Sequence, residues 1–218
     1  MSLLEPILPR ILSLRRIPGA DPALLTAYGA DPSRHRSLGL VTCDQDDPTY
    51  VALDEATKHS PVDVVFAKSF YAGAAHASGA LSGEILGVIA GEDPDQVDAG
   101  LEALVRCLEH DACFHAANDA GTIAVFPHVI ASLGRYLSQA AGLQPGDPMA
   151  YLVAPPMEAT LGLDAALKAA DVRAAKIFPP PTETNFAAAW LTGDLHACQA
   201  AAMAFAEAVV EVGRRPRG

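Results

Sequence analysis

The chain has 218 residues, of which 50% are hydrophobic, so it is long enough for one large domain or for two domains of about 100 residues each. Its 26 acidic residues outnumber its 15 lysines and arginines and give a net charge of −11, which excludes nucleic acid and anionic membranes as expected partners. The four cysteines form no C-x-x-C pair and are too few for a disulfide framework, which favours a reducing, cytoplasmic setting.

The first half of the chain predicts strands and helices in the order β-α-β-α-β-β-α. Apolar or β-branched runs such as "VDVVFAKSFY" indicate strands, and apolar residues spaced along one helix face indicate helices. The predicted strands are 10–17, 37–44, 62–71 and 84–91, and the predicted helices are 21–29, 50–60 and 92–110. Before the last strand, the Gly-rich stretch "AGAAHASGALSG" is expected to form a mobile loop.

The second half is predicted to repeat this order. Its lead-in is a strand at 113–119 followed by the long segment 122–142, which takes the place of the first helix. The remaining predicted strands are 149–156, 172–178 and 186–193, and the remaining helices are 157–171 and 194–213. The stiff loop "PPPTETN" (179–185) stands where the first half has its Gly-rich loop.

A repeated helix signature supports duplication. The pattern L-D-x-A-x-K-x-x-x-V begins at Leu53 and again at Leu163, 110 residues later. The last strands of the two halves end at Gly91 and Gly193, only 102 residues apart, so the first half carries roughly eight extra loop residues. A period this long is the length of a domain and not of a solenoid repeat. The chain is therefore predicted to hold two related α/β domains, at 1–112 and 113–218.

The repeated signature resembles the core of bacterial microcompartment shell proteins. Longer stretches resemble the ethanolamine-utilisation type of these shell proteins. These stretches are "RSLGLVTCDQDDPTYVALDEATKHS", "SFYAGAAH", "GDPMAYLVAPPMEATLGLDAALKAADV" and "PPPTETNFAAAWLTG". The resemblance extends over nearly the whole chain. It implies an α/β fold, an α+β sandwich made of two tandem ferredoxin-like, circularly permuted shell domains.

The resemblance also implies an assembly and a role. Three chains would form a homotrimer that looks like a hexamer, and such trimers would tile with other shell proteins into the cytoplasmic shell of a microcompartment. The chain would then be a structural tile and not an enzyme. Its gated central pore would pass substrates or cofactors. The loops at 68–83 and 179–185 would move between open and closed states, with the Gly-rich loop carrying most of the rearrangement.

An ethanolamine site is implied by the same resemblance. An ammonium ligand needs anionic oxygens and gains from an aromatic face, while its hydroxyl needs a polar partner. The positions that the resemblance assigns to this small pore, which would bias the closed state, are Asp46, Asp47, Glu84, Phe114, Thr184 and Asn185. From the sequence alone, the acids of "CDQDDPT" most often indicate a strand-to-helix turn with an aspartate that caps the helix.

Two further groups of residues follow from the expected role as a shell tile. The expected pore-loop residues are Lys68, Phe70, Tyr71, Gly73, Thr182 and Glu183. The expected tile edge contains Lys58 and Lys168, which recur at the same register of the helix signature. Long lysine stems can lie flat against a neighbour while their ammonium groups reach its carbonyl oxygens. A solvated helix position is the alternative explanation for each lysine.

Catalytic motifs are lacking in the sequence. None of the seven histidines lies in H-E-x-x-H or H-x-H, and no G-x-S-x-G, phosphate loop or G-x-G-x-x-G is present. We therefore expect no catalytic residues, no metal ligands and no cofactor. Two other functions remain open at this point. One is a trimeric small-molecule sensor of ferredoxin-like fold that does not tile, and the other is an uncharacterised hydrolase that uses the acidic cluster.

Overall fold

The chain folds into two compact units. The computed structural model describes residues 5–70, 79–180, 182 and 184–217. Unit 2 consists of Pro9–Ala112 and Gly134–Leu137, and unit 1 consists of the described parts of Met1–Leu8, Cys113–Leu133 and Ser138–Gly218. Each unit thus takes one short segment from the other side of residue 112. The predicted division into 1–112 and 113–218 stays a prediction.

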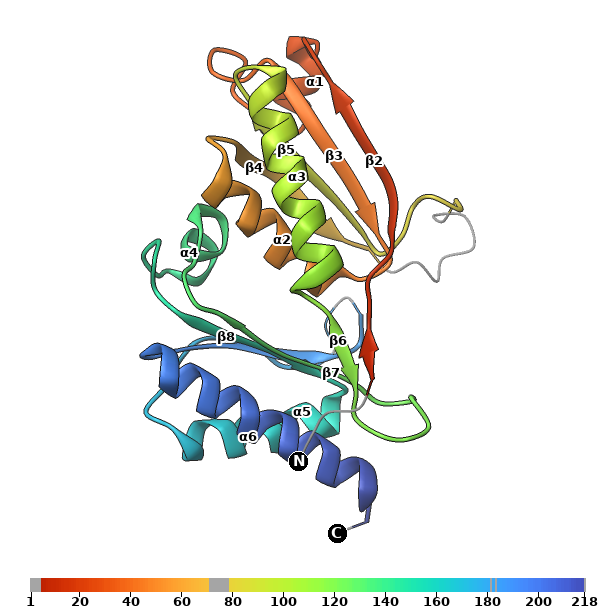
Figure 1. The fold of residues 1–218 in the computed structure, drawn as a ribbon, viewed down its shortest axis with the longest axis vertical. Helices are drawn as coiled ribbons and strands as arrows, with labels where there is room; N and C mark the ends of the chain where they lie inside the picture. The colour runs from red at the N-terminus through yellow and green to blue at the C-terminus, as the bar shows by residue number, and fades with distance from the viewer. Residues whose placement is uncertain (1–4, 71–78, 181, 183, 218) are drawn as a thin grey trace. The chain divides into compact units, whose positions relative to one another are not determined.

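Unit 2 has the predicted element order β-α-β-α-β-β-α (Figure 1). Its strands form one antiparallel sheet in the order β2-β3-β5-β4. The four strands are β2 (Ile11–Ile17), β3 (Ser37–Cys43), β4 (Asp63–Ser69) and β5 (Ile85–Gly91). The three helices are α1 (Pro22–Ala27), α2 (Asp46–His59) and α3 (Pro94–His110).

The sheet of unit 2 buries both of its faces because its central strands alternate. Leu38 of β3 and Val88 of β5 join a core with Leu25 of α1 on one face. On the other face, a Cβ at Gly39 would lie 2.9 Å from Val97 Cγ1 of α3. A side chain at that position would push this helix away, so the glycine permits close packing of the helix on the sheet.

Unit 1 repeats the same core with two additional strands. Its sheet order is β1-β6-β7-β8-β10-β9, in which β7-β8-β10-β9 corresponds to β2-β3-β5-β4 of unit 2. Its strands are β1 (Pro6–Ile7), β6 (Phe114–Ala116), β7 (Ala124–Ile130), β8 (Met149–Ala154), β9 (Arg173–Phe178) and β10 (Ala187–Thr192). Its helices are α4 (Arg135–Ala141), whose first turn belongs to unit 2, α5 (Pro156–Ala169) and α6 (Leu195–Arg214).

The prediction for 122–142 is wrong, because that segment is not one helix. It contains β7 and then α4. Pro127 lies inside β7, where a helix would lose a hydrogen bond and meet a steric clash. A proline is tolerated in the strand because β6 pairs with β7 only at Val125 and Ala124, so β7 has no such neighbour on that side at Pro127.

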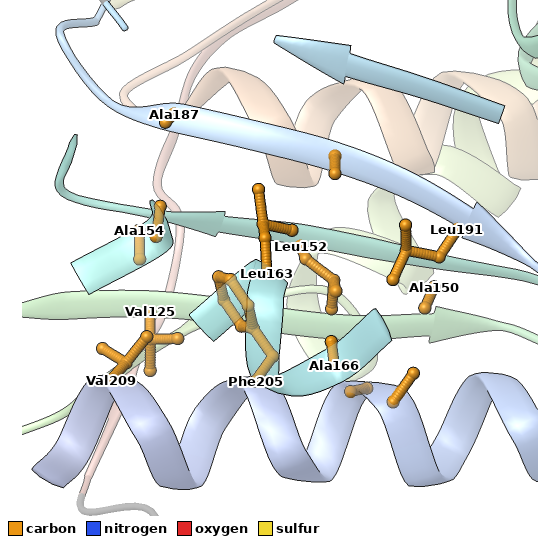
Figure 2. Close-up of a cluster of buried hydrophobic side chains, with 14 of the residues drawn as sticks. Val125, Ala150, Leu152, Ala154, Leu163, Ala166, Ala187, Leu191, Phe205 and Val209 are labelled. Atoms are coloured by element: carbon orange, nitrogen blue, oxygen red, sulfur yellow. The ribbon is translucent and has the colours of Figure 1, made fainter. Parts of the chain in front are cut away.

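The core of unit 1 lies between its sheet and the helices α5 and α6 (Figure 2). Phe205 of α6 is fully buried and reaches toward α5. A Cβ at Gly162 of α5 would lie 2.7 Å from the Phe205 ring, so the two helices can approach closely only because this position is glycine. Leu152 of β8 and Leu191 of β10 close the core from the sheet side.

Among the described residues, α6 is the single helix with the length and apolar composition to cross a membrane. Its Cys198, Phe205 and Val209 are fully buried in the core of unit 1. A buried core helix passes the same test of length and composition, and 39% of the apolar window of α6 is buried.

The repeated helix signature occupies equivalent helices in the two units. Both α2 and α5 have 14 residues and begin 110 residues apart. The environments of their repeated aspartates differ. Asp54 of α2 is fully buried, whereas the side chain of Asp164 of α5 is 62% exposed and pairs with Lys168.

Asp54 is buried because it caps the first turn of α4. Its Oδ2 accepts a hydrogen bond from Gly134 N–H (2.6 Å), and its Oδ1 accepts one from Leu137 N–H (2.8 Å). Thr57 Oγ1 accepts from Arg135 N–H at 3.0 Å. The start of a helix leaves such N–H groups without partners, and α2 supplies the acceptors here. Burial raises the pKa of Asp54, while these N–H donors act in the opposite direction.

We expect Asp54→Asn to destabilise the protein by about 1–3 kcal/mol, because an amide offers one acceptor oxygen where two buried N–H groups need acceptors. The matched control is Asp164→Asn, at the exposed equivalent position, which should change stability by no more than about 0.5 kcal/mol. Urea unfolding of both variants at one protein concentration measures the difference. Equal stabilities of the Asp54→Asn and Asp164→Asn variants would rule out the capping role of Asp54.

Candidate functional site

Two buried aspartates lie at the start of α2. The helix begins at Asp46, four residues before the predicted start, because Pro48 fits a first helical turn. Asp46 and Asp47 are each 8% exposed. The N-cap residue Gln45 makes no side-chain capping bond, and Asp46 Oδ1 instead accepts from Asp47 N–H at 2.9 Å. Negative charge in the first turn of a helix is favoured by the helix dipole.

The two ends of the Gly-rich segment meet beside these acids. Ser69, the last residue of β4, donates its hydroxyl hydrogen to Asp46 Oδ2 at 2.7 Å. Phe70 N–H donates to the carbonyl of Glu84 at 2.9 Å, and Glu84 N–H donates to the carbonyl of Cys43 at 2.7 Å. The backbone of Glu84 is therefore held between β3 and the end of β4.

The electrostatics of this cluster favour a cation. Burial raises the pKa of Glu84, and the nearby carboxylates of Asp46 and Asp44 raise it further. Asp44 already has a cationic partner, because Arg10 Nε donates to its Oδ2 at 2.8 Å. In the part of the chain that the structure describes, the Glu84 carboxylate has no side-chain hydrogen bond or ion pair. An ammonium group beside Glu84 would relieve this repulsion.

The other three residues predicted to bind ethanolamine lie in unit 1. Phe114 of β6 is buried, with its ring centroid 5.0 Å from that of Phe126 and 6.1 Å from that of Phe186. Asn185 precedes Phe186, has a φ of 62°, and donates its N–H to the carbonyl of Thr182 at 3.1 Å. Phe114 is thus close to the turn that contains Thr184 and Asn185.

The structure therefore gathers the six predicted ligand residues into two clusters, three acids in unit 2 and an aromatic and polar group in unit 1. Their role toward a ligand stays a prediction. Sequence reasoning missed Ser69, whose hydroxyl group binds Asp46. A polar residue at the end of a predicted strand was the available signal, but only the fold shows that this strand end faces the start of α2.

The predicted pore-loop residues fall partly within the described chain. Lys68 is exposed near the end of β4, Phe70 is half-buried and follows that strand, and Thr182 Oγ1 donates to the carbonyl of Phe186 at 2.9 Å. Tyr71, Gly73 and Glu183 lie outside the described residues.

Gly83, at the end of the Gly-rich loop, is fixed by its surroundings. It has a φ of +62°, and a Cβ there would lie 2.1 Å from the carbonyl oxygen of Cys43. No other residue type fits both the dihedral angle and this close approach. Thr42 Oγ1 also donates to the carbonyl of Leu81 at 2.7 Å. Residues 81–84 are therefore anchored to β3.

The two predicted tile-edge lysines occupy equivalent last turns of α2 and α5. Each forms an ion pair within its own helix, Lys58 with Glu55 and Lys168 with Asp164. The Lys58 side chain is 24% exposed and the Lys168 side chain is 74% exposed. The equivalence agrees with a shared role, but the role itself stays a prediction.

Metal and nucleophilic chemistry find no support here. Within the described residues, no three histidine, cysteine, aspartate or glutamate side chains are grouped so that they could hold a metal ion. Ser69 donates to a carboxylate, and no histidine contacts it within the described chain.

We expect Glu84→Gln to stabilise the protein at pH 7.5 and to leave its stability unchanged near pH 4. The pKa of Glu84 is raised above its ordinary value of 4.5. Its contribution to stability is therefore complete below that pH and is lost as the pH rises through the raised pKa. A neutral amide avoids this loss. Calorimetric melting temperatures of both proteins across this range provide the measurement, and a wild type that is more stable at pH 7.5 would contradict the expectation.

Comparison with known proteins identifies the family. The model of the BMC domain matches residues 37–120. The chain is 48% identical to the bacterial microcompartment shell protein EutL of Salmonella typhimurium and 49% identical to EutL of Escherichia coli, in each case over 99% of this chain and 98% of the relative. The crystal structure of EutL from Clostridium perfringens superposes with a TM-score of 0.94 at 48% identity and covers 100% of this chain and 98% of that one.

A more distant structure, EtuB from Clostridium kluyveri, matches with a TM-score of 0.76 at 21% identity and shows the shared fold alone. The predicted fold of tandem, circularly permuted shell domains is confirmed by these relatives. So is the prediction of a structural component of a cytoplasmic shell in place of an enzyme. The chain belongs to the EutL family of bacterial microcompartment shell proteins.

Proposed function

We propose that this protein is a trimeric tile of the shell that encloses ethanolamine utilisation, with a gated central pore and a small ethanolamine site that biases the pore toward its closed state. The observation that carries the proposal is the pair of units with the same sheet order in one chain. Three such chains supply six similar units, enough for a hexagonal tile that contacts other shell proteins. A solved relative from Leptotrichia buccalis, 47% identical, is described as an ethanolamine utilization protein.

An exposed apolar face supports assembly with further copies of the chain. Residues Gly134–Leu137 cover α2 within unit 2. The equivalent helix α5 exposes Met157 (66%), Leu161 (48%) and Leu167 (38%) instead. Large apolar side chains that gather on one helix mark interaction sites more often than bare surface. A neighbouring chain in the trimer is the partner that we propose for this face.

The acidic cluster supports ethanolamine as the small ligand. Its ammonium group would bind the carboxylates of Asp46, Asp47 and Glu84, where burial raises the pKa of Glu84 and the nearby carboxylates of Asp46 and Asp44 raise it further. Hydrogen bonds between charged partners contribute about 1.5–3 kcal/mol each before desolvation is subtracted, so binding should be modest. The roles of Phe114, Thr184 and Asn185 toward the same ligand stay predictions.

The position of the cluster links ligand binding to the pore loop. Ser69 and Glu84 flank the loop that we propose to gate the pore; Ser69 donates to Asp46, and Asp46 raises the pKa of Glu84. A cation that neutralises Asp46 and Glu84 removes the repulsion between the start of α2 and the end of the loop. The loop geometry that brings these two acids together is thereby favoured, and we propose that this is the closed state.

We expect wild-type protein to bind ethanolamine with millimolar or tighter affinity at pH 7.5, and Glu84→Gln to weaken binding about tenfold, because one charged hydrogen bond is lost. Wild-type affinity should fall as acidification protonates Glu84, beginning above its ordinary pKa of 4.5. Titration calorimetry measures both effects. Glu102→Gln, an exposed change of the same kind on α3, is the control and should bind as wild type does. Equal affinities in all three proteins would exclude this site.

We expect Lys58→Ala and Lys168→Ala, singly and together, to weaken the formation of sheets while the trimer stays intact, because both lysines lie in the last turns of their helices, outside the core. Light scattering should give about three times 22.7 kDa for every variant. Electron microscopy then scores the sheets, with Lys68→Ala as the control. Arrays that form as readily in the double variant would contradict the edge assignment. Ligand binding by a trimer that never forms sheets would favour a sensor instead.

A further inference from the structure

Two equivalent hollows carry opposite charge patterns. In unit 2, a hollow of about 360 Å³ lies beside Pro61, two residues after the end of α2. In unit 1, a hollow of about 340 Å³ lies beside Asp171, two residues after the end of α5. Pro61 and Asp171 are 110 residues apart, as are the helices that precede them. The hollows are therefore the same feature of the fold, repeated in each unit.

The charged residues that line the two hollows are mostly positive in unit 2 and mostly negative in unit 1. The hollow of unit 2 has two cations and one anion, which are Arg34, Arg36 and Glu92. The hollow of unit 1 has two anions and one cation, which are Asp147, Asp171 and Arg173.

The groups that surround the hollow of unit 2 engage Arg34 and leave Arg36 without an ion pair in the described chain. Asp63 binds Arg34 at 3.3 Å and lies 3.8 Å from Arg135. It also accepts from His35 Nε2, which carries the hydrogen because Nδ1 of that ring accepts from Asp31 N–H.

No ion pair engages Arg36 or Asp171 anywhere in the described chain, and both side chains are exposed. Asp147 accepts a hydrogen bond from Gln144 N–H at 2.9 Å.

The geometry of a hexagonal tile decides which hollows can meet. Three chains of two units each place the two kinds of unit alternately around the tile, so opposite edges always belong to different kinds. When every tile in a layer has the same orientation, each edge faces the opposite edge of its neighbour, and unit 2 meets unit 1. Where two neighbouring tiles differ by half a turn within the layer, the two edges that meet belong to the same kind of unit.

We propose that these two hollows form a charge-matched contact between neighbouring trimers, with unit 2 of one trimer against unit 1 of the next. The inference rests on the proposed function as a tile, since it places the contact at the edge that contains Lys58 and Lys168, three residues before Pro61 and Asp171. Contacts between like units would set Arg36 against Arg36 and Asp171 against Asp171. The charges therefore select layers in which all trimers share one orientation.

Charge reversal and rescue test this contact. Arg36→Glu alone and Asp171→Arg alone should each raise the protein concentration needed for sheets by about fivefold or more at low salt. The double variant should restore assembly to within about twofold of wild type, because the attraction is re-formed with the signs exchanged. Arg106→Glu, the same change on the exposed side of α3, is the control and should assemble as wild type does. Rising salt should reduce the differences between variants.

The outcomes distinguish a failure of the proposed contact from a failure of the proposed tile. Rescue in the double variant, together with electron diffraction that shows a single trimer orientation, would support the contact. Single variants that behave like Arg106→Glu, a double variant without rescue, or layers of alternating orientation would overturn the contact and leave the tile in place. Wild-type trimers that form no sheets would overturn the tile proposal and the contact with it. Light scattering confirms in every case that the variant remains a trimer.

Discussion

The organisation of this chain depends on the hydrogen bonds that the Asp54 carboxylate accepts from the first turn of α4. The carboxylate draws Gly134–Leu137, a segment of the second half of the sequence, into unit 2 by accepting two of its backbone N–H groups. Arg135 adds two hydrogen bonds of 2.6 Å to the carbonyl oxygens of Thr57 and Val62. The helix α4 therefore begins on one unit and ends in the other, and its first turn cannot form fully without α2.

This interaction explains how one repeated helix serves two purposes. In α2 the repeated aspartate is occupied by the chain itself, so the helix is buried on nearly every side. In α5 the same position is occupied only by an ion pair with Lys168, and apolar side chains around it stay exposed. Gene duplication conserves the register of a motif, whereas the partner of each copy depends on what the rest of the chain supplies. The helix whose repeated aspartate caps no other helix in the described chain is also the helix that leaves large apolar side chains exposed.

The sequence was sufficient to predict most of the fold, because helix periodicity and strand composition are local properties. It failed at 122–142, where a strand with an internal proline precedes a short helix, and the apolar content of both pieces suggested one element. The acids of the candidate site were found from their type and their resemblance to a family. Ser69 and the paired hollows were not found, because they depend on strand ends and loops that only the tertiary structure brings together.

The acidic cluster also shows why a destabilising arrangement can be retained. Glu84 is half-buried beside Asp46, and its raised pKa means that the folded protein would be more stable without this charge at neutral pH. Its backbone, by contrast, is held by hydrogen bonds to Phe70 and Cys43, and Gly83 before it admits no side chain. In the proposed site a bound cation would relieve the repulsion between Glu84 and Asp46, and this relief would contribute to the affinity for the cation.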